Sequence, residues 1–405
     1  MKIPFLNKKT SLTKQAEPLQ TKSFGGFSFF SEYANSTFTN FSKHQIDTEA
    51  LSNIIVARCV NLIAQEISCL DPKFYLNNEL IDGIKDNRLK TLLAFPDGKT
   101  SFKDFTFRFI AQYILYGQAF IYKDSPQNAS AMYNVPSDAV CPIYVDKRTK
   151  LALKGYSLGK EDYLFDSKGF SQIFGMNNFN PDSAFEGLSP LYSCGQSVDI
   201  VKKTLQWNYQ VLNQGGRPLG FFSVKNADGR ASELTEQQAE NLKKTLNDAM
   251  NGIKNVGKSI ILEGGLEFTA TQIPAQDMEF FNSQTRNIQL ICSAFGVPSL
   301  LVLPTESTYA NLEQANLQFY QSTIIPLANR YFDLLSGNLL PDNMRVSFFS
   351  EQIPAIAAQR TQAMLDLSSI NFLTLNEKRK HFGLDDLEGG DIITNQQGVP
   401  IGESA

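Results

Sequence analysis

Histidine is almost absent from this sequence, which has His44 and His381 among 405 residues, and tryptophan occurs once. Metal sites built on histidine are therefore not expected. The cysteines are odd in number and none shows CxxC spacing: Cys59, Cys69, Cys141, Cys194 and Cys292. Because a disulfide framework needs paired cysteines, we expect reduced thiols that belong mostly to the core.

Long apolar runs are also absent. No stretch approaches the ~18 apolar residues that a membrane-spanning helix needs. The first residues, MKIPFLNKKTS, contain no apolar signal region. We therefore expect no membrane partner and a protein that is assembled in the cytoplasm.

Positive charge is not in excess. Lys and Arg together number 37 and Asp and Glu number 41, which gives a formal net charge of -4. The class of proteins that bind nucleic acid tightly through a basic surface needs clustered Lys and Arg to neutralise the phosphates. This class is disfavoured, and a DNA partner would have to be enclosed without being tightly bound.

The chain has enough apolar residues, 42% of 405, to fold as a globular protein with two or more sub-domains. Residues 1–46 lack a sustained period and predict a mobile or partner-bound arm. From Asp47 helical spacing predicts three helices. The third opens at Ser101 and carries an aromatic stripe that we assign to the core: Phe105, Phe109, Tyr113 and Tyr116. Between residues 117 and 174 a period near two predicts an antiparallel sheet, which together with the helices indicates an α+β fold.

Two long helical patterns then bracket a small insert. The first spans residues 186–214, where Ser189 suits a helix cap and Gly215-Gly216 a helix end. We expect its apolar stripe to be packed within the subunit or between copies, through Leu191, Val198, Val201, Leu205 and Leu212. The insert contains the strand PLGFFSV, a helix with the capping box Thr235 and Gln238, and a strand pair in KSIILEGGLEFTATQ. The second long helix is QDMEFFNSQTRNIQLICSAFG.

A polar loop, Thr305 to Tyr309, follows FGVPSLLVLP and precedes another long helix, in which Pro326 predicts a kink. RVSFF predicts a returning strand. TLNEKRKHFG predicts a terminal helix with Thr374 and Glu377 as capping box and Gly383 as its end. A loop held between two long helices is suited to project into a space that many subunits surround, and nothing in it suggests bond chemistry.

One motif points elsewhere. Residues 252–259, GIKNVGKS, match the phosphate-loop pattern GxxxxGK[ST]. That site needs a strand before the loop and a helix after it, so that the helix N-terminus faces the phosphates. Here the capped helix LTEQQAENLKKTLNDAM precedes the loop and SIILE follows it. We interpret the motif as a helix-to-strand turn, and a phosphate-loop nucleotide-binding enzyme remains the alternative function.

Other chemical sites lack support. Acidic residues gather around Gly389-Gly390, but loop carboxylates without an established ligand pattern are usually solvated: Asp385, Asp386, Glu388 and Asp391. Neither HExxH nor GxSxG occurs, and no carboxylate pair can be placed across a cleft. We expect no metal, no cofactor, no catalytic residue and no enzyme activity.

In this order the segments resemble the portal proteins of tailed bacteriophages, also called head-tail connectors, including those of prophages and gene transfer agents. The resemblance extends from Asp47 to Asp391. Its most specific segments are EGLSPLYS, QGGRPLGFFSV, FGVPSLLV, STYANLEQANLQFYQSTIIPLANR and LTLNEKRKHFGLDDLEGGD.

The resemblance implies a portal-like subunit with an α+β wing, two long stem helices, a small α/β clip insert and a kinked tunnel helix. By position these are arm 1–46, wing 47–185, stem helix 1 at 186–214, clip 215–275, stem helix 2 at 276–297, tunnel-loop region 298–310, tunnel helix 311–338, and wing strand with C-terminal helix 339–405. The implied tunnel loop facing DNA is Thr305, Glu306, Ser307, Thr308 and Tyr309. The implied partner-binding residues of the clip are Lys243, Lys244, Lys254 and Lys258.

The resemblance further implies a ring of usually twelve copies at one capsid vertex of a virion, assembled in the host bacterial cytoplasm. Double-stranded DNA would pass through its axis during packaging and ejection. The implied partners are other copies of the chain, the major capsid protein, the terminase large subunit and a head-tail adaptor. The chain itself is unlike an adaptor, another ring-forming virion protein, because adaptors are usually much shorter. A near-neutral channel wall would let duplex DNA slide, since DNA carries one negative charge per ~1.7 Å of axis.

Overall fold

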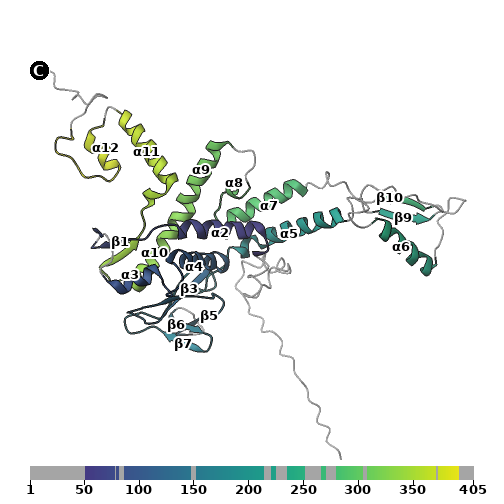
Figure 1. Cartoon of the computed structure of the whole chain (residues 1–405), viewed down its shortest axis with the longest axis horizontal. Helices are drawn as coiled ribbons and strands as arrows, with labels where there is room; N and C mark the ends of the chain where they lie inside the picture. Colours follow the sequence, from purple (N-terminus) through teal and green to yellow (C-terminus); the bar gives the residue numbers. More distant parts are fainter. Residues whose placement is uncertain are drawn as a thin grey trace, which may run out of the picture. The chain divides into compact units, whose positions relative to one another are not determined.

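The computed structural model describes ten stretches of the chain: residues 51–77, 79–81, 86–146, 152–213, 220–224, 235–250, 266–270, 280–303, 308–370 and 373–391. Helices and sheets are mixed along these stretches (Figure 1). All strand pairs described are antiparallel. The α+β prediction is therefore confirmed at this level.

The predicted aromatic stripe lies in the core. Helix α4 (Phe102–Tyr116) begins after Ser101, whose hydroxyl accepts from the amide of Asp104, and ends at Gly117, which has a φ of 74°. Helix α2 (Ile54–Ser68) packs against α4. Phe105, Phe109 and Tyr113 of α4 are buried, as predicted, whereas Tyr116 is only half-buried.

The strands expected between residues 117 and 174 form two three-stranded sheets rather than one. In the first, β3 (Gln118–Lys123) lies between β4 (Met132–Val135) and β8 (Ile173–Asn177). The second has the order β5 (Val140–Tyr144), β6 (Leu153–Leu158), β7 (Glu161–Leu164). A cluster of Phe120, Val135, Val140 and Ile173 joins residues of both sheets. The turn residues between the strands made them visible in the sequence, whereas their division between two sheets depends on packing.

A third sheet joins distant parts of the chain. Strand β1 (Lys73–Leu76) pairs with β2 (Glu79–Ile81) on one side and with β11 (Met344–Ser347) on the other. The returning strand predicted from RVSFF is thus confirmed. The hairpin of β1 and β2 was not predicted. Helix α3 (Asn87–Ala94) follows it and is capped by Asp86, whose side chain accepts from the amide of Arg88.

The two long helices expected around the insert are present. Helix α5 (Leu191–Asn213) and helix α7 (Phe280–Ala294) pack side by side (Figure 1). Between them in sequence, β9 (Gly220–Val224) pairs with β10 (Leu266–Ala270), and α6 (Glu236–Met250) lies between these strands in the chain. The Gln238 side chain accepts from the amide of Thr235 at 3.1 Å, which is half of the predicted capping box.

The last third of the chain is mainly helical. A short helix α8 (Ser299–Val302) precedes α9 (Tyr309–Phe319), a π-helical segment η5 (Tyr320–Ile324) and α10 (Ile325–Leu339). After β11 come the 3-10 turn η6 (Ser350–Gln352), α11 (Pro354–Ser369) and α12 (Leu375–His381). The capping box of Thr374 and Glu377 is confirmed. Helix α11 was not predicted, and none of its described residues is buried, so it offered no apolar period to read.

Candidate functional site

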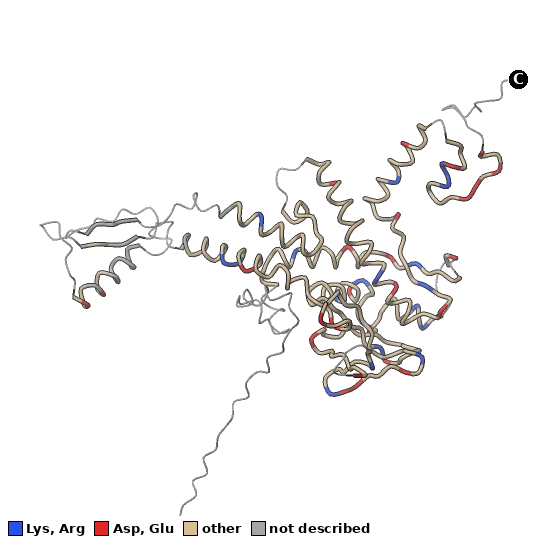
Figure 2. Tube along the Cα trace, turned by 180° about the vertical axis from the view of Figure 1, so that it is seen from behind, with Lys and Arg blue, Asp and Glu red and all other residues tan. Residues whose placement is uncertain are grey.

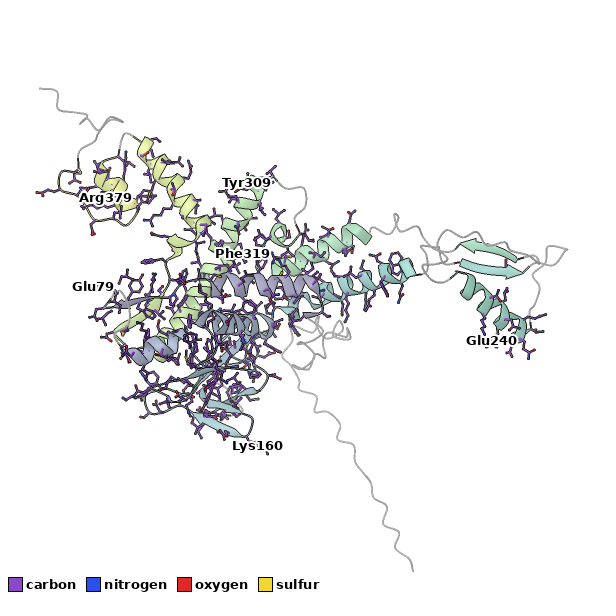
Figure 3. All side chains as sticks on the ribbon, viewed as in Figure 1. Glu79, Lys160, Glu240, Tyr309, Phe319 and Arg379 are labelled. Atoms are coloured by element: carbon purple, nitrogen blue, oxygen red, sulfur yellow. The ribbon has the colours of Figure 1, made fainter. Side chains whose placement is uncertain are left out.

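The loop predicted to have the main functional role is described only at its end. Thr305, Glu306 and Ser307 lie outside the described residues. Thr308 has extended backbone and precedes α9, and Tyr309 begins the helix with 84% of its surface exposed. Figure 3 labels Tyr309 at the start of α9 and Phe319 at its end. Of α9, only Ala315 and Phe319 are buried, so most of this helix is open to solvent or to a partner.

The connection from α7 to α8 is tied to the π-helical segment. Gly296 has a φ of 70°, a conformation that favours glycine, and closes α7 with the amide of Val297 bonded to the carbonyl of Cys292 at 2.9 Å. The hydroxyl of Thr323 in η5 donates to the carbonyl oxygen of Gly296 at 2.6 Å. A Cβ at position 296 would lie 2.9 Å from that hydroxyl oxygen. The segment FGVPSLLV is therefore fixed at this point by backbone geometry as well as by apolar burial.

The kink predicted at Pro326 takes the form of the π-helical segment. Proline has no N–H, and in a regular α-helix its ring meets the carbonyl four residues earlier, which here belongs to Ser322. The helix widens immediately before the proline, and the amide of Ile325 bonds to the carbonyl of Tyr320 five residues back. Single π-helical turns of this kind occur often at functional sites.

Helix α10, beyond the π-helical segment, is held by polar contacts along its length. Arg330 donates to the hydroxyl of Tyr113 at 2.8 Å and to the carbonyl of Asn177 at 2.9 Å. The hydroxyl of Tyr331 bonds to that of Thr106 at 2.9 Å. The Tyr331 ring also lies 5.2 Å from Phe109. These contacts fix α10 on α4 and on the end of β8.

A fully buried lysine makes a further contact with α10. The Nζ of Lys123 in β3 donates to the carbonyl of Asn338 at 2.8 Å and lies 5.3 Å from the centre of the Phe174 ring. The carbonyl belongs to the last turn of α10, where a cation is favoured. Burial lowers the pKa of Lys123 from 10.5 to about 8, and the charge of Asp166 opposes this shift.

We expect Lys123→Met to change how stability depends on pH. Below pH 8 Lys123 is protonated in the folded and unfolded states alike, so burial of the charge opposes folding fully. As pH rises through 8 the folded state loses this proton while the unfolded state keeps it, and stability rises. Between pH 7 and pH 9 the wild type should therefore gain about 1 kcal/mol relative to Lys123→Met. Chemical denaturation of both proteins at several pH values measures this difference, and parallel curves would contradict it.

The segment EGLSPLYS packs on the junction of α4 and β3. The amide of Gly187 donates to the side-chain oxygen of Gln118 at 2.9 Å. Gly187 approaches Gly117 so closely that an added Cβ would lie 2.6 Å from the carbonyl carbon of Gly117. The Ser189 hydroxyl accepts from the amide of Leu191 at 3.1 Å and donates to the carbonyl of Leu115, so it caps α5 and also ties it to α4.

The apolar stripe predicted on α5 is buried over its first part only. Leu191, Val198 and Val201 are buried, whereas Leu205 is 49% exposed. The side chain of Leu212 lies outside the described residues. Packing of Leu205 within the subunit was one of two expected arrangements and is not found. Contact with another copy of the chain therefore remains the prediction for this residue.

The predicted lysines of the insert are mostly beyond what the structure describes. Lys244 of α6 is exposed, and nothing is described of the side chains of Lys243, Lys254 and Lys258. The phosphate-loop motif at 252–259 also lies outside the described residues. Helix α6 ends at Met250, directly before the motif, so the helix precedes the loop as the sequence indicated. Figure 2 shows the positions of Lys and Arg interspersed with those of Asp and Glu along the described parts of the chain.

Within the described stretches, no group of three or more His, Cys, Asp or Glu could hold a metal ion. The acidic residues near the end of α12 have other partners: Asp386 pairs with Lys380 at 3.1 Å, and Asp391 accepts from Asn376 at 2.9 Å. All five cysteines lie within the described stretches and form no disulfide, and Cys59, Cys194 and Cys292 are buried. No described helix is both long and apolar enough to cross a bilayer.

Comparison with known families decides the identity. The family model described as "Phage portal protein" matches residues 55–383, which include every described element from α3 to α12 and nearly all of α2. The chain belongs to the phage portal protein family. The resemblance inferred from the sequence is thereby confirmed.

Individual portal proteins and structures agree. The chain is 25% identical over 370 residues to the portal protein of Enterobacteria phage HK97, covering 88% of this chain and 84% of that one. It is 31% identical over 371 residues to an uncharacterized protein of Rickettsia bellii, covering 90% and 95% of the two chains.

A chain in the "Neck of native GTA particle computed with C12 symmetry" matches with a TM-score of 0.60 and 26% identity, over 85% of this chain and 94% of that one. An HK97-family portal protein from Corynebacterium diphtheriae, 13% identical over 77% of this chain and 95% of its own, has a TM-score of 0.53 and shows the same fold.

Several contacts of this portal subunit were not predicted from its sequence. Tyr320, Arg330 and Lys123 gave no local signal, because their partners are far away in the chain. Gly187 lies in a segment that was recognised, but its close approach to Gly117 is visible only in the structure. Local sequence patterns therefore identify the segments, and the folded chain shows which residues hold them together.

Proposed function

We propose that this chain forms the portal ring of a virion, a conduit for double-stranded DNA during packaging and ejection. The observation that carries the proposal is the match to the neck of the gene transfer agent particle, which has C12 symmetry, over 85% of the chain. The ring would lie at one capsid vertex and contain twelve copies. Its role is structural, with no catalytic residue.

The surface of the described subunit supports assembly. Leu205 and Tyr209 on α5 and Leu290 on α7 are exposed large apolar side chains on the paired long helices. A repeated contact between different faces closes into a ring when the rotation between copies is suitable, and it would cover such residues. In this proposal α5 and α7 are the stem helices, and residues 47–185 are part of the wing.

The remaining assignments follow the family resemblance. The insert at 215–275 is the clip, which would bind the terminase large subunit during packaging and the head-tail adaptor afterwards. Lys243, Lys244, Lys254 and Lys258 are the proposed contacts. The wing would meet the major capsid protein. The loop Thr305 to Tyr309 would face DNA, backed by α9, η5 and α10.

Electron microscopy of the purified full-length chain tests this function. Annular particles with a central channel are expected, and rotational averaging should give twelvefold symmetry. A chain that stays monomeric at every concentration tested would refute the proposal. Nucleotide hydrolysis by such a monomer would favour the phosphate-loop alternative.

The loop assignment has its own test. We expect Glu306→Ala and Tyr309→Ala to lower the amount of DNA packaged or retained while rings still form, because these residues lie at the proposed DNA-facing loop and not in the stem. The measurement is nuclease-protected DNA in assembled particles, with ring formation followed by electron microscopy. Unchanged packaging in both variants would exclude this role.

A further inference from the structure

Helix α9 is held by fewer buried residues than α10. Helix α10 has six buried residues and the polar contacts of Arg330, Tyr331 and Asn338 described above. Helix α9 has two buried residues in eleven. The two helices are joined through the π-helical segment, and α9 also contacts α8 and α11.

A hydrogen bond joins this segment to α2. The Tyr320 hydroxyl donates to a carboxylate oxygen of Glu66 at 2.5 Å, across 254 residues of sequence. Glu66 lies in the last turns of α2, which packs against α4 and thus belongs to the same core as α10. Burial and the bond to Glu66 both raise the pKa of Tyr320, which keeps the hydroxyl protonated and able to donate. Hydrogen bonds to a charged group are among the stronger ones in proteins.

The other contacts of η5 differ in kind. Thr323 binds the carbonyl of Gly296 at the end of α7, and Gln321 binds the side chain of Gln359 in α11 at 2.8 Å. Helix α7 packs on α5 and on α2, whereas α11 has no buried residue, and both of these hydrogen bonds join uncharged groups. Among the contacts described, the bond from Tyr320 to Glu66 is therefore the charged link between the π-helical segment and the core.

We propose that Glu66 and Tyr320 are positioning residues that fix the direction of α9, and with it the exposed Tyr309, relative to α10. A π-helical turn interrupts the regular hydrogen-bond ladder and is one of the places where helices change direction. The hydrogen bond selects one of the arrangements that this turn allows. The inference rests on the proposed portal function only for its consequence, which is the placement of Tyr309 in the ring.

Hydrogen–deuterium exchange on the assembled full-length protein tests the proposal without DNA. Tyr320→Phe keeps the aromatic side chain but removes the hydroxyl that donates the hydrogen bond. Glu66→Ala removes the carboxylate that accepts it. Both should speed amide exchange in residues 309–319 by about tenfold, the size expected for a hydrogen bond to a charged group, and leave residues 325–339 unchanged. Glu66→Gln, which keeps an acceptor oxygen, should restore most of the protection.

The outcomes separate the possible failures. Unchanged exchange in α9, or equal acceleration in α9 and α10, would overturn the positioning role, because the second result indicates general destabilisation. If Tyr320→Phe gives no soluble protein, Glu66→Ala and Glu66→Gln are compared instead. The positioning role then requires that Glu66→Ala speeds exchange in α9 but not in α10, and that Glu66→Gln does so much less. Absence of rings in the wild type would refute the proposed function instead, since the exchange pattern of the subunit does not depend on DNA passage.

Discussion

Replacing Gly187 by alanine is expected to cause a severe loss of stability. The added Cβ would overlap the carbonyl oxygen of Gly117 and lie 3.1 Å from the amide nitrogen of Asn178. These are backbone atoms, and the amide of Asn178 is bonded to that same carbonyl at 2.7 Å. No side-chain rotation can relieve the overlap. The junction of α4, β3 and α5 would have to separate, and we expect a loss of about 3 kcal/mol or more in the free energy of unfolding.

A matched control lies in α10. Gly337 is an exposed helical glycine with nothing within 4 Å of an added Cβ. Gly337→Ala should therefore stabilise the protein by about 0.5–1 kcal/mol, because alanine loses less backbone entropy in a helix. Denaturant unfolding of both variants measures the contrast. Equal effects of the two substitutions, or a stable Gly187→Ala protein, would show that the close approach of Gly187 and Gly117 is not needed.

The second large effect is expected for Leu205→Glu combined with Tyr209→Glu on α5. These residues are one helical turn apart, are 49% and 67% exposed, and continue the direction of the buried stripe through Leu191, Val198 and Val201. If a neighbouring copy covers them, the variant buries unpaired charge at every contact around the ring. Such a charge costs roughly 3–5 kcal/mol, which weakens each contact by more than 100-fold. Rings should be lost while the subunit remains folded.

The control for this variant is Gln206→Glu combined with Gln210→Glu. It adds the same two charges to exposed positions of the same helix at the same spacing, without removing apolar surface. We expect it to retain more rings than the Leu205 and Tyr209 variant. Light scattering and electron microscopy give the assembly state, and thermal unfolding of the subunit shows that the fold is intact. Rings that persist in the Leu205 and Tyr209 variant would mean that this face lies outside the interface.

Local sequence signals predicted much of this fold. The aromatic stripe of α4, the alternating strands from β3 to β7 and the capping box of α12 each depend on residues within one element. The family segments depended on short-range order in the same way. Helix α11 and the hairpin of β1 and β2 were missed. In α11 no residue is buried, and β2 has three residues, so neither offered a period to recognise.

The arrangement of the candidate site could not be derived in this way. The sequence predicted an irregularity at Pro326 but not that it would be a π-helical turn bonded through Tyr320 to Glu66. It predicted burial along the α5 stripe but not that Leu205 would remain exposed in the subunit. The bond from Tyr320 to Glu66 joins residues 254 positions apart, and the exposure of Leu205 depends on how far other elements cover α5. Such partners leave no trace in local spacing.

The sequence by itself determined the type and order of most elements and the family, because periodicity, caps and characteristic segments are local properties of the chain. Tertiary structure alone decided that Gly187 meets Gly117, that Lys123 reaches the last turn of α10, and that Tyr320 meets Glu66. The physical reason is that steric exclusion, burial of charge and hydrogen bonding between distant residues arise only when packing brings their atoms together.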